Sequence, residues 1–183
     1  PAVADEVQRR ILEPTIAELA RRGTPFVGCL FAGLMLTAEG PRVIEFNARF
    51  GDPETQVVLP LLENDLLEVI QACLEGRLHE VELRFRSGAA ANVVLASAGY
   101  PGPYTKGLPI SGLVEADQAG VTVFHAGTAF DDEGQVVTAG GRVLGVMAMG
   151  PTLREALDLA YAGVARIEFE GKTFRRDIGW QAL

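Results

Sequence analysis

The stretch RVIEFNARFGDPETQ, from Arg42 to Gln56, decides how the rest of the chain is interpreted. Its first part alternates between apolar and polar residues, which predicts a β-strand over residues 42–50 with one buried and one polar face. Glu45, Asn47 and Arg49 fall on the polar face of that strand. A carboxylate, a carboxamide and a guanidinium are therefore expected on one side of the same strand.

The chemistry of this polar face suits a metal-bound phosphate. Glu45 and Asn47 lie about 6–7 Å apart along the backbone, so their oxygen donors can converge on one hard cation. Mg²⁺ favours such a site, with its remaining positions filled by water and phosphate oxygens. Arg49 cannot bind a metal, but its planar guanidinium can hold a phosphate or a carboxylate. The alternative is an exposed, charged sheet face in which Glu45 and Arg49 offset each other's charge.

The turn that follows, GDPETQ, predicts that a helix begins directly after the strand. Pro53 suits the first turn of a helix over residues 55–62, with Asp52 before it as N-cap. Backbone N–H groups and the helix dipole at such a start favour a bound anion. An ordinary capped helix without a ligand is the other interpretation of the same residues.

Two further helices are predicted in the first half of the chain. Apolar residues recur at helical spacing over Asp5–Arg22, where Pro14 is expected to kink or divide the helix and Gly23 to end it. Another helix is predicted over residues 64–75, capped by its first or second residue and ended by Gly76. The first of these helices is amphipathic, with arginines and glutamates on the face opposite its apolar residues.

After residue 86 the sequence pattern changes to short apolar segments separated by glycine-rich turns. Segments predicted as strands are residues 90–98, 107–114, 121–129, 136–139 and 142–149. Gly140-Gly141 separates the last two, which predicts a hairpin. A final helix over residues 153–168 is predicted to begin after Thr152 as its N-cap.

These elements predict an α+β chain of two domains. Residues 26–37 are rich in apolar side chains and precede a turn at residues 38–41, so they are expected to form a β-hairpin with the strand over 42–50. The change of sequence pattern after residue 86 predicts a domain boundary near residues 86–89. We therefore predict one domain over residues 1–86 and a second, small α+β domain over residues 87–183.

The composition limits the class of partner. The formal net charge of −8 repels nucleic acid and anionic membrane surfaces, so neither is an expected partner. A bound cation or a few arginines can still reverse the sign of the potential inside one pocket, so a small anionic substrate is compatible with this charge. Cys29 and Cys73 are far apart in the sequence and lack metal-site spacing, and the apolar run over residues 26–36 is too short for a membrane helix. A reducing cytoplasm is the expected compartment.

Two long segments resemble the phosphoribosylamine-glycine ligase family, also called the glycinamide ribonucleotide synthetase family. The first, PFVGCLFAGLMLTAEGPRVIEFNARFGDPETQVVLPLLENDL, resembles the end of that family's ATP-grasp domain. The second, NVVLASAGYPGPYTKGLPISG, resembles the start of its small C-terminal domain, and the resemblance continues through VFHAGT, TAGGRVLGVMAMG, LREALDLAYAGVARIEF and FRRDIG. It covers essentially the whole chain, and EFNARFGDPETQ is specific to this family among ATP-grasp enzymes.

The resemblance implies a ligase of purine biosynthesis. Members of the family use ATP to phosphorylate glycine, and the amine of 5-phosphoribosylamine then displaces phosphate from glycyl phosphate to give glycinamide ribonucleotide. The family's metal ligands match Glu45 and Asn47, which implies a bound Mg²⁺ or Mn²⁺ here. Arg49, Asp52 and Glu54 are second-rank candidates for contact with phosphate or substrate. No residue of this chain is assigned a catalytic role.

The resemblance also implies that much of the ATP site lies outside this chain. The family's N-terminal part, with its glycine-rich loop and phosphate-binding lysines, would precede Pro1, and the chain itself has only Lys106 and Lys172. We therefore expect a fragment that is inactive by itself and whose partner is the missing N-terminal part. Two other interpretations remain open: a non-catalytic nucleotide-binding module, and another ATP-grasp ligase such as a carboxylase component.

Overall fold

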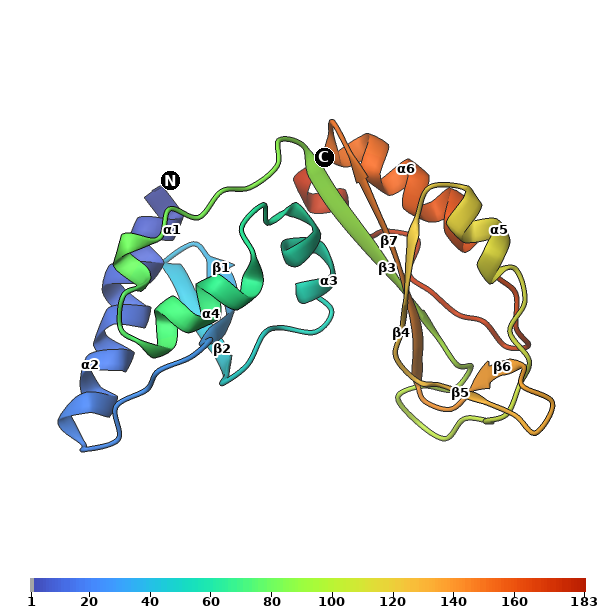
Figure 1. Cartoon of the computed structure of the whole chain (residues 1–183), viewed down its shortest axis with the longest axis horizontal. Helices are drawn as coiled ribbons and strands as arrows, with labels where there is room; N and C mark the ends of the chain where they lie inside the picture. Colours follow the sequence, from blue (N-terminus) through green and yellow to red (C-terminus); the bar gives the residue numbers. More distant parts are fainter. Residues whose placement is uncertain (1) are drawn as a thin grey trace. The chain divides into compact units, whose positions relative to one another are not determined.

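The computed structural model describes residues 2–183 and combines helices with antiparallel sheets, which confirms the α+β class (Figure 1). In the first 83 residues the elements are α1 (Ala2–Val7), the π-helical η1 (Gln8–Leu12), α2 (Glu13–Arg21), β1 (Phe31–Thr37), β2 (Gly40–Asn47), α3 (Thr55–Val58), the 3₁₀ turn η2 (Leu59–Leu61), α4 (Leu66–Leu74) and the 3₁₀ turn η3 (Leu78–Glu80). The later elements are β3 (Ala89–Ala96), α5 (Leu113–Gln118), β4 (Thr122–His125), β5 (Thr128–Phe130), β6 (Val136–Thr138), β7 (Arg142–Gly150), α6 (Leu153–Val164) and the 3₁₀ turn η4 (Trp180–Ala182).

The chain forms two compact units. The first unit comprises the chain up to Asp52 together with Asn64–Leu83, and the second comprises Pro53–Glu63 and Arg84–Leu183. The segment that carries α3 and η2 therefore belongs with the later strands, although it precedes α4 in the sequence. The division into domains over residues 1–86 and 87–183 stays a prediction.

The N-terminal helix is divided just before Pro14, as its sequence predicts. Proline has no N–H to donate to the carbonyl one turn back, and the π-helical η1 occupies the turn that precedes it. Gly23 ends the helix with φ of 78°. Its N–H donates to the Ala20 carbonyl and the N–H of Thr24 donates to the Leu19 carbonyl, both at 3.0 Å, which is the Schellman pattern.

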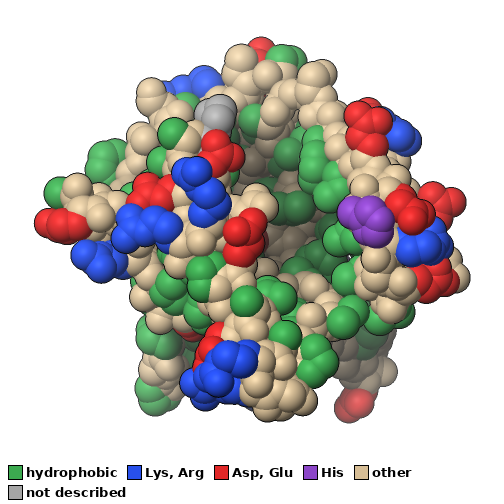
Figure 2. Space-filling view, turned by 90° about the vertical axis from the view of Figure 1, so that its left-hand side faces the viewer, with side chains coloured by type: hydrophobic (Ala, Val, Ile, Leu, Met, Phe, Trp, Pro, Cys, Tyr) green, Lys and Arg blue, Asp and Glu red, His purple; other side chains and the backbone are tan. Residues whose placement is uncertain are grey.

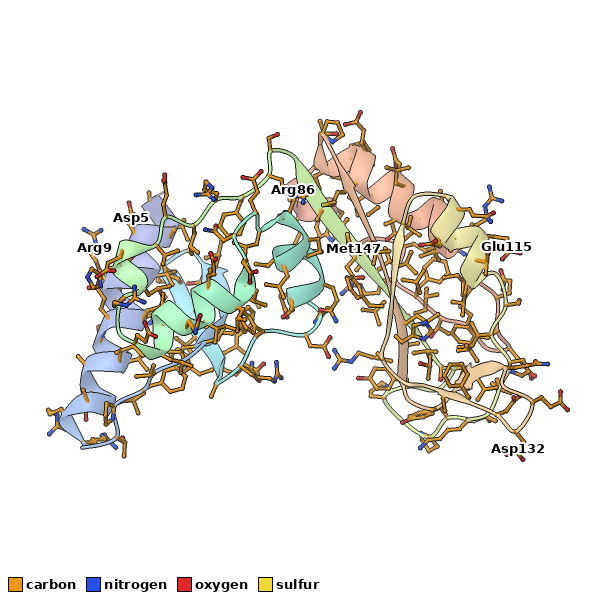
Figure 3. The ribbon with its side chains drawn as sticks, in the orientation of Figure 1. Asp5, Arg9, Arg86, Glu115, Asp132 and Met147 are labelled. Carbon is orange, nitrogen blue, oxygen red and sulfur yellow. The ribbon has the colours of Figure 1, made fainter. Side chains whose placement is uncertain are left out.

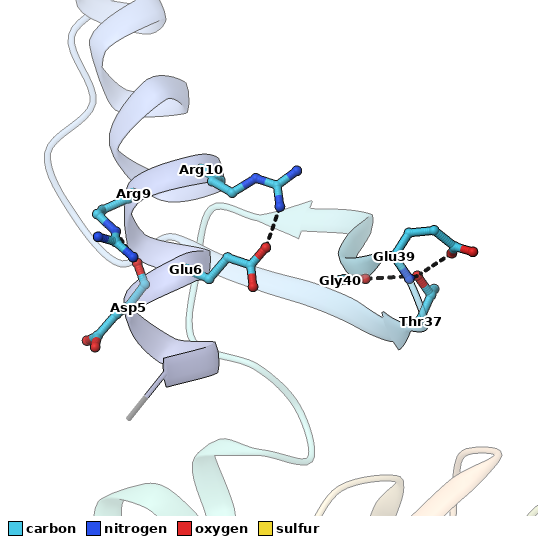
Figure 4. A network of polar contacts seen from close by, with 7 residues as sticks. All are labelled: Asp5, Glu6, Arg9, Arg10, Thr37, Glu39 and Gly40. Atoms are coloured by element: carbon cyan, nitrogen blue, oxygen red, sulfur yellow. Dashed lines mark hydrogen bonds and ion pairs between the residues drawn. The ribbon is translucent and has the colours of Figure 1, made fainter.

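The predicted hairpin is confirmed. β1 and β2 are antiparallel, and Thr37 pairs with Gly40 across the turn. The Thr37 hydroxyl accepts from the Glu39 N–H at 3.2 Å and donates to the Gly40 carbonyl at 2.9 Å, so one side chain closes the turn (Figure 4). The same view shows the exposed ion pair between Glu6 and Arg10 on the neighbouring helix.

The predicted burial of one face of this hairpin is wrong for the described residues. Ile44 is 64% exposed and Phe46 is 41% exposed. One reason is a β-bulge: Gly33 pairs with Glu45 but Leu34 pairs with Val43, so Ile44 is an extra residue that breaks the alternation. The other reason is that β1 and β2 form a sheet of two strands, and no other strand among residues 2–183 extends it.

The helix predicted over residues 55–62 forms as α3 followed directly by the 3₁₀ turn η2, which ends at Leu61, but its N-cap differs from the prediction. α3 begins at Thr55, its N-cap is Glu54, and the Glu54 side chain makes no capping hydrogen bond. The prediction that Asp52 caps a helix with Pro53 in its first turn is therefore wrong. Residues 52–54 form a turn where the chain passes from one unit to the other, and α3 packs on β3, so tertiary contacts override the local capping signal.

The predictions for α4 are confirmed. Asp65 is the N-cap and its carboxylate accepts from the Leu67 N–H at 2.8 Å. The helix ends at Leu74, and Gly76 follows with φ of 70°, a left-handed conformation that glycine adopts without strain. Within residues 2–183, no helix combines the length and the apolar character that a membrane span requires.

The second unit has a well-formed core. β3, β7 and β4 form an antiparallel sheet with β7 in the centre, and α6 packs on one of its faces. Alternate residues of β3 are buried, and burial of Val93 and Leu95 contributes about 1.5–3 kcal/mol each. Met147 lies among the strands of this core, whereas Glu115 points away from it (Figure 3).

The last helix begins as predicted and ends earlier. The hydroxyl of Thr152 accepts from the Glu155 N–H at 3.3 Å, and the Glu155 carboxylate accepts from the Thr152 N–H at 3.0 Å, which forms a complete capping box. α6 ends at Val164 instead of Glu168. The Lys172 ammonium group donates to the Val164 carbonyl at 3.2 Å and so satisfies an acceptor at the end of this helix.

Three strand predictions for the second unit are wrong. The strand predicted over residues 121–129 is two strands, β4 and β5, which belong to different sheets. β6 pairs with β5 and not with β7, so Gly140-Gly141 does not form the turn of a β6–β7 hairpin. The glycines instead allow close backbone approach: a Cβ on Gly127 would lie 2.5 Å from the Cα of Gly140, and a Cβ on Gly141 would lie 2.1 Å from the Tyr100 ring. The segment 107–114 makes single bridges at Pro109 and Ser111 in place of a strand, and α5 begins at Leu113.

Candidate metal and phosphate site

Glu45 and Asn47 lie at the end of β2 and their side chains are in contact. The Nδ2 of Asn47 donates to the Oε1 of Glu45 at 3.1 Å. Both side chains therefore lie on the same face of the strand, as alternation beyond the bulge requires. Glu45 is exposed and Asn47 is half-buried, so the pair is accessible to a ligand and anchored on one side.

Gly33 makes room for the Glu45 side chain, and the sequence analysis did not single it out. The two residues pair across the hairpin, and a Cβ on Gly33 would lie 3.2 Å from the Cγ of Glu45. That separation is tighter than an ordinary van der Waals contact, so a side chain at position 33 would push Glu45 aside. A glycine inside an apolar strand segment is the signal that points to such a close approach.

Arg49 does not lie on the strand. β2 ends at Asn47, because Asn47 pairs with Phe31 and β1 has no residue beyond Phe31 to continue the ladder. Arg49 lies in the bend that follows, where its Nη1 donates to the Phe50 carbonyl at 2.7 Å. The predicted strand over residues 42–50 is thus too long by its last three residues, and the phosphate-binding role of Arg49 stays a prediction.

The remaining two candidates belong to different units. Asp52 is exposed and ends the first unit, together with Glu45, Asn47 and Arg49. Glu54 is exposed and belongs to the second unit, at the start of α3. Because α3 has four residues, its dipole is too small to attract an anion strongly to its N-terminus. The assignment of Asp52 and Glu54 to substrate or phosphate therefore rests on the family resemblance alone.

The donor set of Glu45 and Asn47 fits a hard cation. A carboxylate and a carboxamide oxygen are ligands that Mg²⁺ accepts, and it usually keeps several waters or phosphate oxygens in its other positions. No group of three or more His, Cys, Asp or Glu side chains in residues 2–183 gathers to hold a metal. A cation held here would therefore take its further ligands from a nucleotide, from water or from another polypeptide segment.

Cys29 is not a candidate nucleophile. Cys29 and Cys73 are free and half-buried. Burial raises the pKa of the Cys29 thiol, and the nearby Cys73 raises it further. A raised pKa favours the protonated thiol, which is a poor nucleophile.

Two protein-family models match the sequence of this chain. The C domain of phosphoribosylglycinamide synthetase matches residues 90–181, and the ATP-grasp (A) domain of the same synthetase matches residues 1–55. The chain belongs to the phosphoribosylglycinamide synthetase family. This membership confirms the resemblance found in the sequence, and the ATP-grasp match includes all five candidate residues, namely Glu45, Asn47, Arg49, Asp52 and Glu54.

Individual members of the phosphoribosylglycinamide synthetase family are similar over the whole chain. A phosphoribosylamine–glycine ligase from Synechocystis is 53% identical over 185 residues, which cover 100% of this chain and 44% of the relative. A crystal structure of the ligase from Thermotoga maritima is 37% identical and has a TM-score of 0.82, over 97% of this chain and 43% of that one. The chain thus spans less than half the length of these relatives.

More distant structures share the fold. The biotin carboxylase domain of a 2-oxoglutarate carboxylase from Hydrogenobacter thermophilus has a TM-score of 0.56, over 91% of this chain and 37% of that one, with 16% sequence identity. At that identity the similarity concerns the fold alone. The two family matches therefore separate this chain from the carboxylases, which were the other ligase interpretation of its sequence.

Proposed function

We propose that this chain is part of an ATP-dependent ligase that joins glycine to 5-phosphoribosylamine. The observation that carries the proposal is the match of both family domains to one chain, with Glu45 and Asn47 in contact at the end of β2 inside the ATP-grasp match. The product would be glycinamide ribonucleotide, with ADP and phosphate, in purine biosynthesis. The same proposal places the protein in the cytoplasm.

The reaction has two steps in this proposal. A carboxylate oxygen of glycine attacks the γ-phosphorus of ATP, ADP leaves, and glycyl phosphate forms. The amine nitrogen of 5-phosphoribosylamine then attacks the carbonyl carbon, phosphate leaves, and the nitrogen loses a proton. The first step needs neutralised negative charge and an aligned phosphate more than it needs a protein nucleophile.

The residues of this chain would supply part of that electrostatic support. Glu45 and Asn47 would hold Mg²⁺ or Mn²⁺, which supplies positive charge to the phosphates when it is bound. The guanidinium of Arg49 would hold a phosphate or carboxylate group, and Asp52 and Glu54 would contact substrate. The hydrogen bond from Asn47 keeps the Glu45 carboxylate on the required face of β2.

The rest of the ATP site would come from the part of the protein outside this chain. The chain spans 41% and 44% of two bacterial relatives, and the ATP-grasp match ends at residue 55. We propose that the complementary part is N-terminal and contributes the residues that hold adenine and most of the phosphate contacts. The 183-residue chain by itself should therefore show no turnover.

A hybrid enzyme tests the proposal. In the hybrid, this chain replaces the matching 44% of the Synechocystis ligase, to which it is 53% identical. We expect glycine-dependent release of ADP in the presence of phosphoribosylamine. Glu45→Ala should lower the rate about 100-fold or more, because it removes a charge-stabilising ligand of the phosphoryl-transfer site.

Glu39→Ala is the matched control, because it removes a carboxylate from the same hairpin, at its turn. The control should retain the rate of the unmodified hybrid. Full turnover in Glu45→Ala would refute the metal assignment. ADP binding without glycine-dependent turnover in the unmodified hybrid would favour a non-catalytic nucleotide-binding module instead.

A further inference from the structure

The first unit has almost no core of its own. Among the described hydrophobic residues that are buried, Ala72 comes from the first unit and all the others come from the second. A folded domain normally shields many large apolar side chains in one interior. The first unit instead leaves most of its large apolar side chains half-buried or exposed.

Helix α4 exposes an apolar stripe. Leu67, Ile70 and Leu74 are exposed at the spacing of one helix face, while Ala72 is buried on the opposite side. Leu67 is 66% and Leu74 is 68% exposed. A surface helix normally turns polar residues outward, so an exposed apolar stripe suggests a covering partner, and α4 has nine residues, too few for a membrane span. We call Leu67, Ile70 and Leu74 the α4 outer stripe.

The hairpin is a second surface that the described chain leaves uncovered. No strand among residues 2–183 pairs with the outer edge of β1 or of β2. Met35, Leu36 and Ile44 on these strands are all exposed. A two-stranded sheet is marginally stable in water by itself, and unpaired strand edges readily accept further strands. Figure 2 views the molecule from the side of the N-terminal helices and shows hydrophobic side chains among the charged ones.

We propose that the α4 outer stripe and the open edges of the β1–β2 hairpin form the surface on which the remaining part of the full-length ligase docks. This part would lay apolar side chains over the stripe and pair strands with the hairpin. The relatives argue for this occupant, because more than half of the length of each lies outside the matched region and the ATP-grasp match takes in only residues 1–55 of this chain. The identity of the occupant rests on the proposed function.

Hydrogen exchange in the hybrid enzyme tests this surface. Amides of α4, β1 and β2 should exchange at least about tenfold more slowly in the hybrid than in the 183-residue chain alone, because docking buries them. Amides of β3 and β7, which have their own core, should exchange at similar rates in both. Equal exchange of α4, β1 and β2 in the two proteins would overturn the proposal.

A double substitution, Leu67→Glu with Leu74→Glu, tests the stripe directly. Both positions are exposed in this chain, so the isolated chain should keep its unfolding midpoint within about 1 °C, as surface substitutions usually do. The hybrid should lose about 10 °C or more, because two glutamates would be buried against apolar groups. Phe130→Glu, at a position in the second unit that is 76% exposed, is the control and should change neither midpoint.

The outcomes separate this inference from the proposed function. A hybrid that tolerates the double substitution overturns the surface even if it turns over glycine. A hybrid that protects α4 but has no ligase activity keeps the surface and refutes the function. An isolated chain that forms a stable dimer with α4 protected from exchange also overturns the proposal, because a second copy would then be the occupant.

Discussion

Lys172 caps the end of α6, and its replacement by methionine is expected to destabilise the second unit. The ammonium group donates to the Val164 carbonyl at 3.2 Å, to the Ile167 carbonyl, and to the Glu168 carboxylate at 2.9 Å. Methionine keeps most of the apolar stem but has neither donor nor charge. In Lys172→Met, two backbone carbonyls therefore lose a charged partner near the C-terminal end of a helix dipole.

The size of the effect follows from the burial of this contact. A hydrogen bond to a charged group contributes about 1.5–3 kcal/mol, and an exposed ion pair such as that with Glu168 adds less than about 1 kcal/mol. The Lys172 side chain is 11% exposed, so water can replace the lost donors only in part. We expect Lys172→Met to lower the free energy of unfolding of the second unit by about 3 kcal/mol.

Urea unfolding of the isolated chain measures this change. Far-UV circular dichroism reports on the helices, and Trp180, the chain's single tryptophan, reports on the second unit by fluorescence. Glu168→Gln is the control, because it removes the ion pair and leaves both carbonyl contacts of Lys172 in place. The reasoning is refuted if Lys172→Met costs no more than Glu168→Gln.

Two further predictions concern glycine and a carboxylate. Gly112→Ala should lower the free energy of unfolding by at least about 3 kcal/mol, because φ is 81° and the new Cβ would lie 1.8 Å from the Arg166 carbonyl oxygen. Gly134→Ala, with a similar φ of 79° but open space around the new Cβ, should lower it by about 1 kcal/mol. Equal unfolding midpoints of the two variants in urea would contradict this. The Arg175 guanidinium lowers the pKa of Asp177 below its usual 3.8, so the stabilisation from this pair is present at neutral pH and is lost as the pH falls through the lowered pKa. NMR titration should show that shift, and Arg175→Ala should return the pKa to its usual value.

The ends of helices were predictable from the sequence where residues within one turn determine them. Pro14 divides the first helix, and Asp65 and Thr152 cap the helices that follow them, because each effect acts within one turn. The contact between Glu45 and Asn47 was predictable for the same reason, since residues two apart on a strand share a face. Their role as metal ligands stays a prediction.

The failures arise where distant contacts decide the structure. The bulge at Ile44 depends on how β1 aligns with β2, which residues 42–50 do not encode by themselves. The start of α3 at Thr55 depends on its packing against β3 in the other half of the chain. Gly140-Gly141 has the composition of a hairpin turn, but close contacts with Gly127 and Tyr100 explain these glycines instead.

The chain passes three times between its two units, so a single cleavage of the backbone cannot separate them. The connections at residues 52–53, 63–64 and 83–84 each join one unit to the other. A protease that cuts any one of them leaves the units covalently tethered through the other two. Release of either unit in one piece is therefore impossible by a single cut, and a truncation that begins at residue 84 would deprive β3 of the α3 segment that packs on it.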